Sequence, residues 1–213
     1  MAAIFRQIKS GGDRNFAYLI AEAETKEAVL IDPSPDVRAV SESIKRYDFE
    51  LKYLINTHSH YDHSSGNGYF KTGKEGNPVR FVNCGRDTEI KSESTIRLGD
   101  LEIVLIPTPG HTPDSICIKA GRRLITGDTL FVGKIGGTYS EDDAKKEFDS
   151  LKKIVMLPPE TEIWPGHDCG TRPSSTIYDE LRENPFIKSL NDFNQFLWLK
   201  NNWASYKKEH GIR

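Results

Sequence analysis

Four short segments of this chain carry residues that commonly bind metal ions, and each follows a stretch that is typical of a β-strand. The longest segment holds three histidines and one aspartate within six residues, His58-Ser59-His60-Tyr61-Asp62-His63. The other three segments contribute one such residue each, namely His111, Asp128 and His167. Because strand ends lie at the rim of a sheet, where loops form binding sites, we expect the four segments to converge on one point.

The kinds of ligand indicate which metals to expect. Imidazole and carboxylate groups without a thiolate are typical of zinc, iron or manganese sites rather than of a structural zinc site rich in cysteine. Five histidines and two aspartates exceed the ligands of a single four-coordinate ion, so the set predicts two divalent metal ions, with zinc preferred over iron or manganese. The sixth histidine, His210, lies in a charged tail and is interpreted as a solvated residue.

The composition of the chain limits its function further. The length of 213 residues suits one domain with a small appendage. A formal net charge of −2 gives no electrostatic reason to bind nucleic acid or a membrane surface. Three cysteines are too few for a disulfide framework and suit a reducing compartment, so we expect a cytoplasmic protein. We find neither a membrane-spanning apolar stretch nor the apolar region of a secretory signal.

Hydrophobic patterning predicts a strand-rich fold with few helices. Strands are expected over residues 4–8, 15–21, 27–31, 51–55, 79–83, 94–98, 101–106, 115–119, 122–126 and 162–164. Helices are expected to begin at Ser34, with Pro35 in its first turn, and at Ser140. A tail helix is expected after the break at Asn184-Pro185. Its buried face should comprise Phe186, Leu190, Phe193 and Leu197. Two packed sheets with helices outside fit this order better than a doubly wound parallel sheet.

The ligand-bearing motifs resemble those of the metallo-β-lactamase superfamily. The resemblance rests on Thr57-His58-Ser59-His60-Tyr61-Asp62-His63, Gly110-His111-Thr112, Gly127-Asp128-Thr129 and Pro165-Gly166-His167. Residues 28–33, 108–113, 127–131, 175–177 and 184–185 are similar to the glyoxalase II and persulfide dioxygenase branch. The resemblance covers roughly residues 4–187 and implies an α/β fold, the αββα sandwich of two mixed sheets flanked by helices. We therefore expect a catalytic domain over residues 1–187 and a helical C-terminal extension, residues 188–213, packed on it.

The spacing of the ligands and the resemblance together divide them between two ions. One ion is expected to be held by His58, His60 and His111. The other is expected to be held by Asp62, His63 and His167, with Asp128 bridging the two. Asp32 ends a strand just before a proline, and two interpretations of it are open: a hydrogen-bond partner of a ligand histidine, or a turn residue.

The resemblance implies a metal-dependent hydrolase that cleaves a thioester, as glyoxalase II does. A water between two ions has its pKa lowered towards neutrality and can attack the thioester carbonyl. Asp62 is expected to bind metal and to orient that water. The residues expected to complete the catalytic set are His58, His60, His63 and Asp128. The leaving thiolate, whose parent thiol has a pKa of about 8.5, needs little general acid. The expected substrate is a small thioester or thiol-derived molecule such as an S-acylglutathione, bound by a monomer or homodimer.

An alternative uses the same residues for oxygen chemistry. His58, His111 and Asp128 alone make a two-histidine, one-carboxylate triad, which is the arrangement of non-haem iron oxygenases. Persulfide dioxygenases of the branch resemble that design, with one iron. Residues 112–113 and 127–131 look more like glyoxalase II and favour hydrolysis, and a lactonase is a third, less favoured possibility.

Two residues depart from the pattern of the branch. Lys134 lies in a segment where the branch commonly has Gly-Cys-Gly-Arg, and Cys169 lies where it often has tyrosine. Lys134 is interpreted either as a cation for an anionic thiol carrier or as a solvated residue. Cys169 is interpreted either as a redox-sensitive thiol or as a small buried residue.

Overall fold

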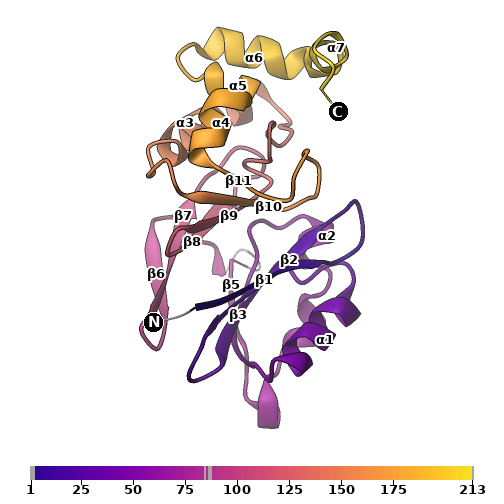
Figure 1. The fold of residues 1–213 in the computed structure, drawn as a ribbon, viewed down its shortest axis with the longest axis vertical. Helices are drawn as coiled ribbons and strands as arrows, with labels where there is room; N and C mark the ends of the chain where they lie inside the picture. The colour runs from indigo at the N-terminus through magenta and orange to yellow at the C-terminus, as the bar shows by residue number, and fades with distance from the viewer. Residues whose placement is uncertain (1–2, 84, 86–87, 213) are drawn as a thin grey trace.

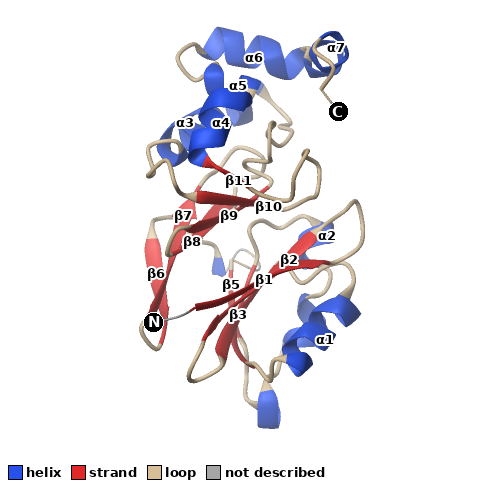
Figure 2. Ribbon diagram, in the orientation of Figure 1, coloured by secondary structure: helices blue, strands red, loops and turns tan. Residues whose placement is uncertain are grey.

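The structure, a computed structural model, describes residues 3–83, 85 and 88–212. Two β-sheets form its centre, as Figure 1 and Figure 2 show. The first sheet has the strand order β1-β2-β3-β4-β5. Its strands are β1 (Ala3–Lys9), β2 (Phe16–Glu22), β3 (Glu27–Ile31), β4 (Glu50–Ile55) and β5 (Arg80–Val82). The sheet is mixed, because β1, β2 and β3 pair antiparallel whereas β3, β4 and β5 pair parallel.

The second sheet has the strand order β11-β10-β9-β8-β7-β6. Its strands are β6 (Ser94–Leu98), β7 (Leu101–Pro107), β8 (Ile116–Ala120), β9 (Arg123–Gly127), β10 (Glu162–Pro165) and β11 (Ser175–Thr176). All neighbouring strands are antiparallel except β9 and β10, which run parallel. The expected strands are confirmed to within about a residue at each end, whereas β11 was not expected, since two residues are too few for a periodic pattern.

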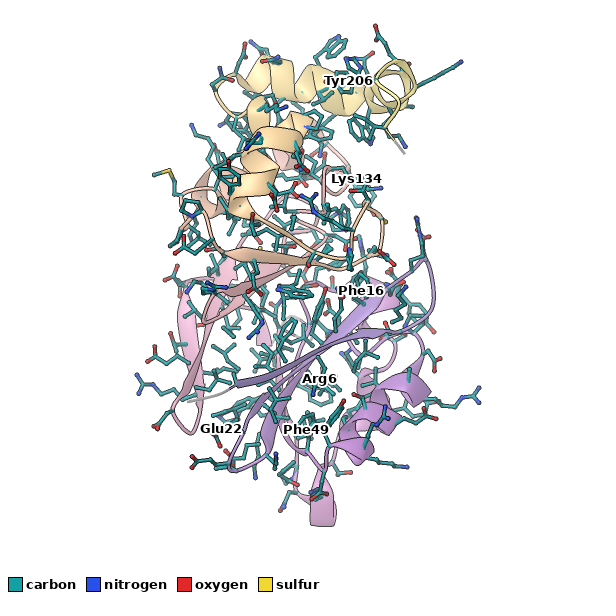
Figure 3. The ribbon with its side chains drawn as sticks, in the orientation of Figure 1. Arg6, Phe16, Glu22, Phe49, Lys134 and Tyr206 are labelled. Atoms are coloured by element: carbon teal, nitrogen blue, oxygen red, sulfur yellow. The ribbon has the colours of Figure 1, made fainter. Side chains whose placement is uncertain are left out.

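The two sheets face each other across one apolar core. Strand alternation turns one set of side chains from each sheet inward. The first sheet contributes Phe16, Tyr18, Ile20, Val29, Ile31 and Ile55, and the second contributes Leu98, Ile103, Leu105, Ile116, Ile118 and Ile125. Figure 3 shows Phe16 where the two sheets meet. The Tyr18 hydroxyl crosses the interface and donates to Pro165 O at 2.6 Å, so the edge of the second sheet is tied to the first.

Helices cover the outer face of each sheet. The helix α1 (Val37–Arg46) packs through Val40 on the first sheet, and α3 (Glu141–Ile154) packs through Phe148 and Leu151 on the second. The remaining helices are α2 (Tyr61–Ser64), α4 (Ile177–Glu183), α5 (Pro185–Lys188), α6 (Phe193–Asn201), α7 (Trp203–Glu209) and the 3-10 turns η1 (Asn67–Phe70) and η2 (Lys74–Gly76). The αββα sandwich is therefore confirmed (Figure 2).

The start of the first helix differs from the prediction. Asp36, not Ser34, caps α1, and its carboxylate accepts from Arg38 N at 3.0 Å. Ser34 is buried in the preceding loop, where its hydroxyl accepts from Gly66 N at 2.6 Å and so cannot cap a helix. The predicted cap of α3 is confirmed, because Ser140 Oγ accepts from Asp143 N.

The tail forms three short helices instead of the predicted single one. The helix α5 ends at Lys188, and Asp192 then caps α6 by accepting from Asn194 N at 2.9 Å. The buried residues of α6 are Phe196 and Leu199, whereas Leu197 is partly exposed. The new cap rotates the register, so a single stripe from Phe186 to Leu197 does not form.

The C-terminal extension packs on the rest of the chain at α3. The Phe196 ring lies 5.3 Å from the Phe148 ring, a T-shaped contact between α6 and α3. The expected boundary between residues 187 and 188 falls inside α5, and the division into a domain and an extension stays a prediction. Across the described residues, no helix is long and apolar enough to cross a membrane.

Candidate metal centre

The seven predicted ligand residues lie together where four strands end. The strand β4 leads into His58, His60 and the single-turn helix α2, which carries Asp62 and His63. His111, Asp128 and His167 follow the ends of β7, β9 and β10. Their ligand atoms form three overlapping groups, within each of which the atoms lie within 4.8 Å of one another. The expected convergence of the four segments is therefore observed.

The first group consists of three imidazoles. His60 Nδ1 lies 3.0 Å from His58 Nε2 and 3.0 Å from His111 Nε2. The rings of His58 and His111 stand nearly perpendicular to that of His60. Three nitrogens that point at one another in this way leave their lone pairs directed to a common point, which suits a metal ion.

The second group consists of Asp62, His63 and His167. The two histidines face each other with their Nε2 atoms 3.2 Å apart. Asp62 Oδ2 lies 3.5 Å from each of these nitrogens. The two groups share no residue, and their membership is the one predicted for two separate ions.

Asp128 lies between the two groups. Its Oδ1 is 3.5 Å from His63 Nε2, and its Oδ2 is 3.4 Å from His167 Nε2 and 3.6 Å from His111 Nε2. The predicted bridging position is thus compatible with the geometry, because this carboxylate faces residues of both groups. Asp128 also forms the third group with His58 and His63.

Hydrogen bonds at the opposite ring nitrogens orient the histidines. His111 Nδ1 lies 2.8 Å from Gly137 O, and His167 Nδ1 lies 2.8 Å from Asp13 O. A carbonyl can only accept, so each of these rings carries its proton on Nδ1 and leaves Nε2 free as a ligand. Carbonyls of this kind carry no signature in a sequence, which is why Asp13 and Gly137 were not predicted.

Asp32 orients His63 in the same way. Its Oδ2 lies 3.0 Å from His63 Nδ1 and accepts from Thr57 Oγ1 at 2.6 Å. Its Oδ1 accepts from Thr57 N at 2.8 Å. Of the two interpretations of Asp32, the structure supports the hydrogen-bond partner of a ligand-type histidine.

Burial and charge set the protonation of the site. Burial, reinforced by the charge of His63, holds the pKa of His58 well below its usual value. Burial likewise lowers the pKa of His111, so the imidazoles of His58 and His111 are biased towards the neutral form, which binds metal. Although burial alone would lower it, the charge and hydrogen bond of Asp32 raise the pKa of His63 to about 9. Burial opposes ionisation of Asp128 too, yet the neighbouring histidines, His167 foremost, lower its pKa.

The residues present fit divalent metal ions. Asp128 Oδ1 is buried, and among the described residues it has no hydrogen-bond donor. A buried carboxylate oxygen without a donor is costly unless a cation lies beside it. Nitrogen and oxygen ligands suit zinc, iron and manganese alike, so the donor set does not select one metal or a number of ions.

Two further residues at the centre were not predicted. Asn15, at the start of β2, donates from Nδ2 to Asp62 Oδ2 at 2.9 Å and so holds that carboxylate in place. Tyr139 is 82% exposed, and its hydroxyl lies 3.4 Å from His60 Nε2 at the open side of the centre. Neither residue belongs to a strand-end motif, so the sequence held no signal for them beyond their polar side chains.

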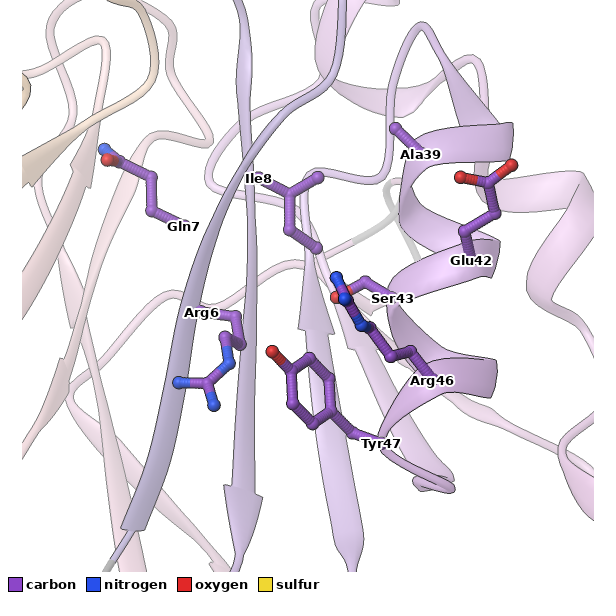
Figure 4. Close-up of a pocket in the computed structure, with 8 residues that line it drawn as sticks. All are labelled: Arg6, Gln7, Ile8, Ala39, Glu42, Ser43, Arg46 and Tyr47. Atoms are coloured by element: carbon purple, nitrogen blue, oxygen red, sulfur yellow. The ribbon is translucent and has the colours of Figure 1, made fainter.

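Of the grooves in the described structure, two are relevant to the sequence predictions and the surface near them. One, of about 530 Å³, separates β1 from α1 and is lined by Arg6, Arg46 and Tyr47 among others, but by none of the seven ligand residues (Figure 4). The other, of about 420 Å³, is lined by Lys134 and Cys169. The second groove is also lined by none of the seven ligand residues, although Cys169 follows His167 by two residues in the sequence.

Lys134 and Cys169 are the two residues that depart from the pattern of the branch. Lys134 lies in the loops between the second sheet and the C-terminal helices (Figure 3). Burial raises the pKa of the Cys169 thiol, although the charges of Lys134 and Arg14 act in the opposite direction. A raised pKa disfavours the reactive thiolate, so the interpretation of Cys169 as a small, partly buried residue is the better supported.

Comparison with known proteins identifies the family. The family model described as the Metallo-beta-lactamase superfamily matches residues 10–82 and 73–167, which include all seven ligand residues. The chain belongs to the metallo-beta-lactamase superfamily. The resemblance seen in the motifs is confirmed, and so is the fold that it implied.

Superfamily members of two reaction types are similar to this chain. The cytoplasmic isozyme of hydroxyacylglutathione hydrolase from Saccharomyces cerevisiae is 33% identical over 211 residues, covering 88% of this chain and 76% of that protein. The mitochondrial persulfide dioxygenase ETHE1 of Homo sapiens is 30% identical over 207 residues, covering 90% and 82%. The crystal structure of ETHE1 from Myxococcus xanthus has a TM-score of 0.78 at 30% identity and covers 94% of this chain and 91% of that one. The chain is therefore a metal-dependent hydrolase or dioxygenase of the superfamily.

Proposed function

We propose that this protein is a metal-dependent hydrolase that cleaves a small thioester, such as an S-acylglutathione, with two divalent ions, preferably zinc. The observation that carries the proposal is the second ligand group. His63 and His167 are each held by a hydrogen bond at Nδ1, and Asp62 is held by Asn15. Orientation of this kind is what a metal ligand requires. We take this orientation as support for two ions, because the one-iron alternative assigns no ligand to the second group.

The residues around the centre have different roles in the proposed hydrolysis. Two bound metal ions would supply a water of lowered pKa and a positive charge opposite the developing oxyanion. The Asp62 side chain is 43% exposed and can accept a hydrogen bond from the attacking water, which orients its lone pair. The exposed Tyr139 hydroxyl can donate to the substrate. The leaving thiolate comes from a thiol with a pKa of about 8.5, so no strong general acid is needed.

The groove lined by Lys134 and Cys169 supports a thiol-derived substrate. Lys134 lines this groove, and a cation there suits the carboxylate of an anionic thiol carrier. The groove volume of about 420 Å³ is in the range of small-molecule sites. We propose on this basis that the thiol carrier of the substrate is a small anionic thiol. We also propose that the protein acts as a monomer or homodimer and binds neither nucleic acid nor a membrane.

Persulfide oxidation with one iron is the second candidate function. It is favoured by the likeness to the ETHE1 structure, which covers more than nine-tenths of both chains. His111 Nε2 and Asp128 Oδ2, two members of the required triad with His58, lie 3.6 Å apart. The triad includes neither His63 nor His167. Replacing His167 should therefore affect the two-ion hydrolase and spare the one-iron dioxygenase.

The test combines metal content with two activities in wild type and one variant. We expect two metal ions per chain, hydrolysis of S-lactoylglutathione, and no oxygen uptake with glutathione persulfide. His167→Ala removes a ligand of the second group, so it should abolish hydrolysis, whereas His210→Ala, in the exposed tail, should act as wild type. One iron per chain, with oxygen uptake that survives His167→Ala, would establish the dioxygenase instead.

A further inference from the structure

Lys200 links the C-terminal extension to the loops behind His111. It lies on α6, and its side chain is only 9% exposed. The ammonium group donates to Glu147 Oε2 on α3, whose side chain is fully buried. It also donates to the backbone carbonyl of Gly136 at 3.0 Å. One cation therefore joins α6, α3 and the loop after Asp128.

The Gly136 end of this link leads to His111. The next carbonyl along the chain, Gly137 O, lies 2.8 Å from His111 Nδ1. Gly136 itself is packed so closely that a Cβ there would lie 2.1 Å from Asp128 O and 2.9 Å from His111 Nδ1. A shift of Gly136 would therefore move the carbonyl that orients the His111 ring.

The Glu147 end leads to the same histidine from the other side. Gly110 precedes His111 and packs against Glu147, so that a Cβ there would lie 2.3 Å from Glu147 Cβ and 2.4 Å from its Cα. One turn further along α3, Ser150 Oγ donates to Pro109 O at 2.7 Å. The helix α3 thus supports the turn that delivers His111.

Stability alone does not account for this ion pair. Burial raises the pKa of Glu147 to about 7, against the charge and hydrogen bond of Lys200, so the charged form of Glu147 is held at a cost. Replacing a buried ion pair by apolar residues of similar volume is often neutral or stabilising. The ammonium group instead fixes geometry, because its donors hold the Glu147 carboxylate and the Gly136 carbonyl in place relative to each other.

We propose that Lys200 is a positioning residue of the metal centre. Together with Glu147 it holds the Gly136–Gly137 segment, so that His111 keeps its proton on Nδ1 and presents Nε2 to His58 and His60. The C-terminal extension thereby completes the centre. The effect on metal affinity rests on the proposed function, whereas the orientation of His111 can be measured in the metal-free protein.

The variants that test this must separate positioning from folding. Lys200→Met alone leaves Glu147 buried without its partner and is expected to destabilise the fold. The double variant Lys200→Met/Glu147→Gln removes both charges at similar volume, so we expect it to fold. Lys208→Met is the matched control, because Lys208 lies exposed on α7.

Two readouts apply to the folded variants. In metal-free protein, ¹⁵N NMR of the histidine rings should show a single Nδ1-protonated form of His111 in wild type and a mixture of forms in the double variant, with His63 unchanged. In a zinc titration against a chromophoric chelator, one of the two affinities should fall by about 10–100-fold in the double variant. Lys208→Met should match wild type in both.

The outcomes are decisive in either direction. A folded double variant whose His111 signal and two zinc affinities equal those of wild type would overturn the positioning role. Should the wild-type protein bind neither zinc nor another divalent ion, the proposed function fails, while the His111 signal still decides whether Lys200 positions that ring.

Discussion

Replacing Asp32 by asparagine should weaken metal binding at the second ligand group while leaving the fold intact. Asp32 has a φ of 48°, a left-handed conformation that asparagine tolerates well. The asparagine carbonyl can take the place of Oδ1, which accepts from Thr57 N at 2.8 Å. The amide nitrogen then takes the place of Oδ2, which lies 3.0 Å from His63 Nδ1.

The exchange of an acceptor for a donor acts on the His63 tautomer. An amide NH₂ only donates, so His63 Nδ1 must become an acceptor and the ring proton moves to Nε2. Nε2 is the nitrogen that faces His167 at 3.2 Å, and once protonated it cannot bind a metal ion. Loss of such an orienting partner typically costs 10–100-fold in affinity, or about 1.4–2.7 kcal/mol. The Thr57 hydroxyl can rotate to accept from the amide, while its oxygen still faces His58 Nδ1 at 3.1 Å.

The assay is a zinc titration against a competing chelator, with ¹⁵N NMR of the histidine rings in parallel. In Asp32→Asn we expect one affinity to fall by about 10–100-fold and the other to hold. Asp36→Asn is the control, because Asp36 caps α1, contacts none of the seven ligand residues, and asparagine caps a helix equally well. If Asp32→Asn binds both ions as wild type does and His63 keeps its Nδ1 proton, the reasoning from Asp32 is refuted.

Three further predictions concern single residues. Asp128→Ala should abolish metal-dependent activity, because Asp128 faces both ligand groups; near-normal turnover would remove it from the site. Tyr139→Phe should raise KM several-fold with little change in kcat, since its exposed hydroxyl lies beside His60; an unchanged KM would mean that it does not touch substrate. Burial raises the pKa of Glu147 to about 7, so the folded protein holds the Glu147 proton more tightly than the unfolded chain does. This preference stabilises the fold fully below the pKa of Glu147 in the unfolded chain, and it is lost as the pH rises through 7. Relative to Lys200→Met/Glu147→Gln, wild type should therefore lose about 3 kcal/mol of unfolding free energy between pH 4 and 8, and parallel denaturation curves across that range would contradict this.

Local patterns in the sequence were enough to locate the strands and the candidate ligand residues. Local apolar runs and turn residues located ten strands to within about a residue, because periodicity and turn chemistry are local properties. The candidate ligand residues were found for the same reason, since each lies in a segment that follows a strand end. Convergence of His58, His111, Asp128 and His167 could then be expected from the general placement of binding loops at a sheet rim.

Local signals failed where a long-range contact decided the outcome. Ser34 is a good helix cap in isolation, but its hydroxyl is occupied by Gly66 N, 32 residues away in sequence. The apolar residues of the tail predict one continuous helix, yet Asp192 caps a second helix, α6, whose buried face is in a different register. In both places a hydrogen bond determined the element boundary, and hydrophobic periodicity does not report hydrogen bonds.

The way in which the candidate ligand residues are held follows from contacts between distant parts of the chain. The tautomers of His111 and His167 depend on the carbonyls of Gly137 and Asp13, and every residue has a carbonyl, so no residue type marks these two. The role of Asp32, open in the sequence, was settled by its distance to His63. Lys200 reaches the loop after Asp128 from α6, a helix that lies far from that loop in the sequence. Residue types specify which groups can bind a metal, whereas the direction of each lone pair is a property of the packed fold.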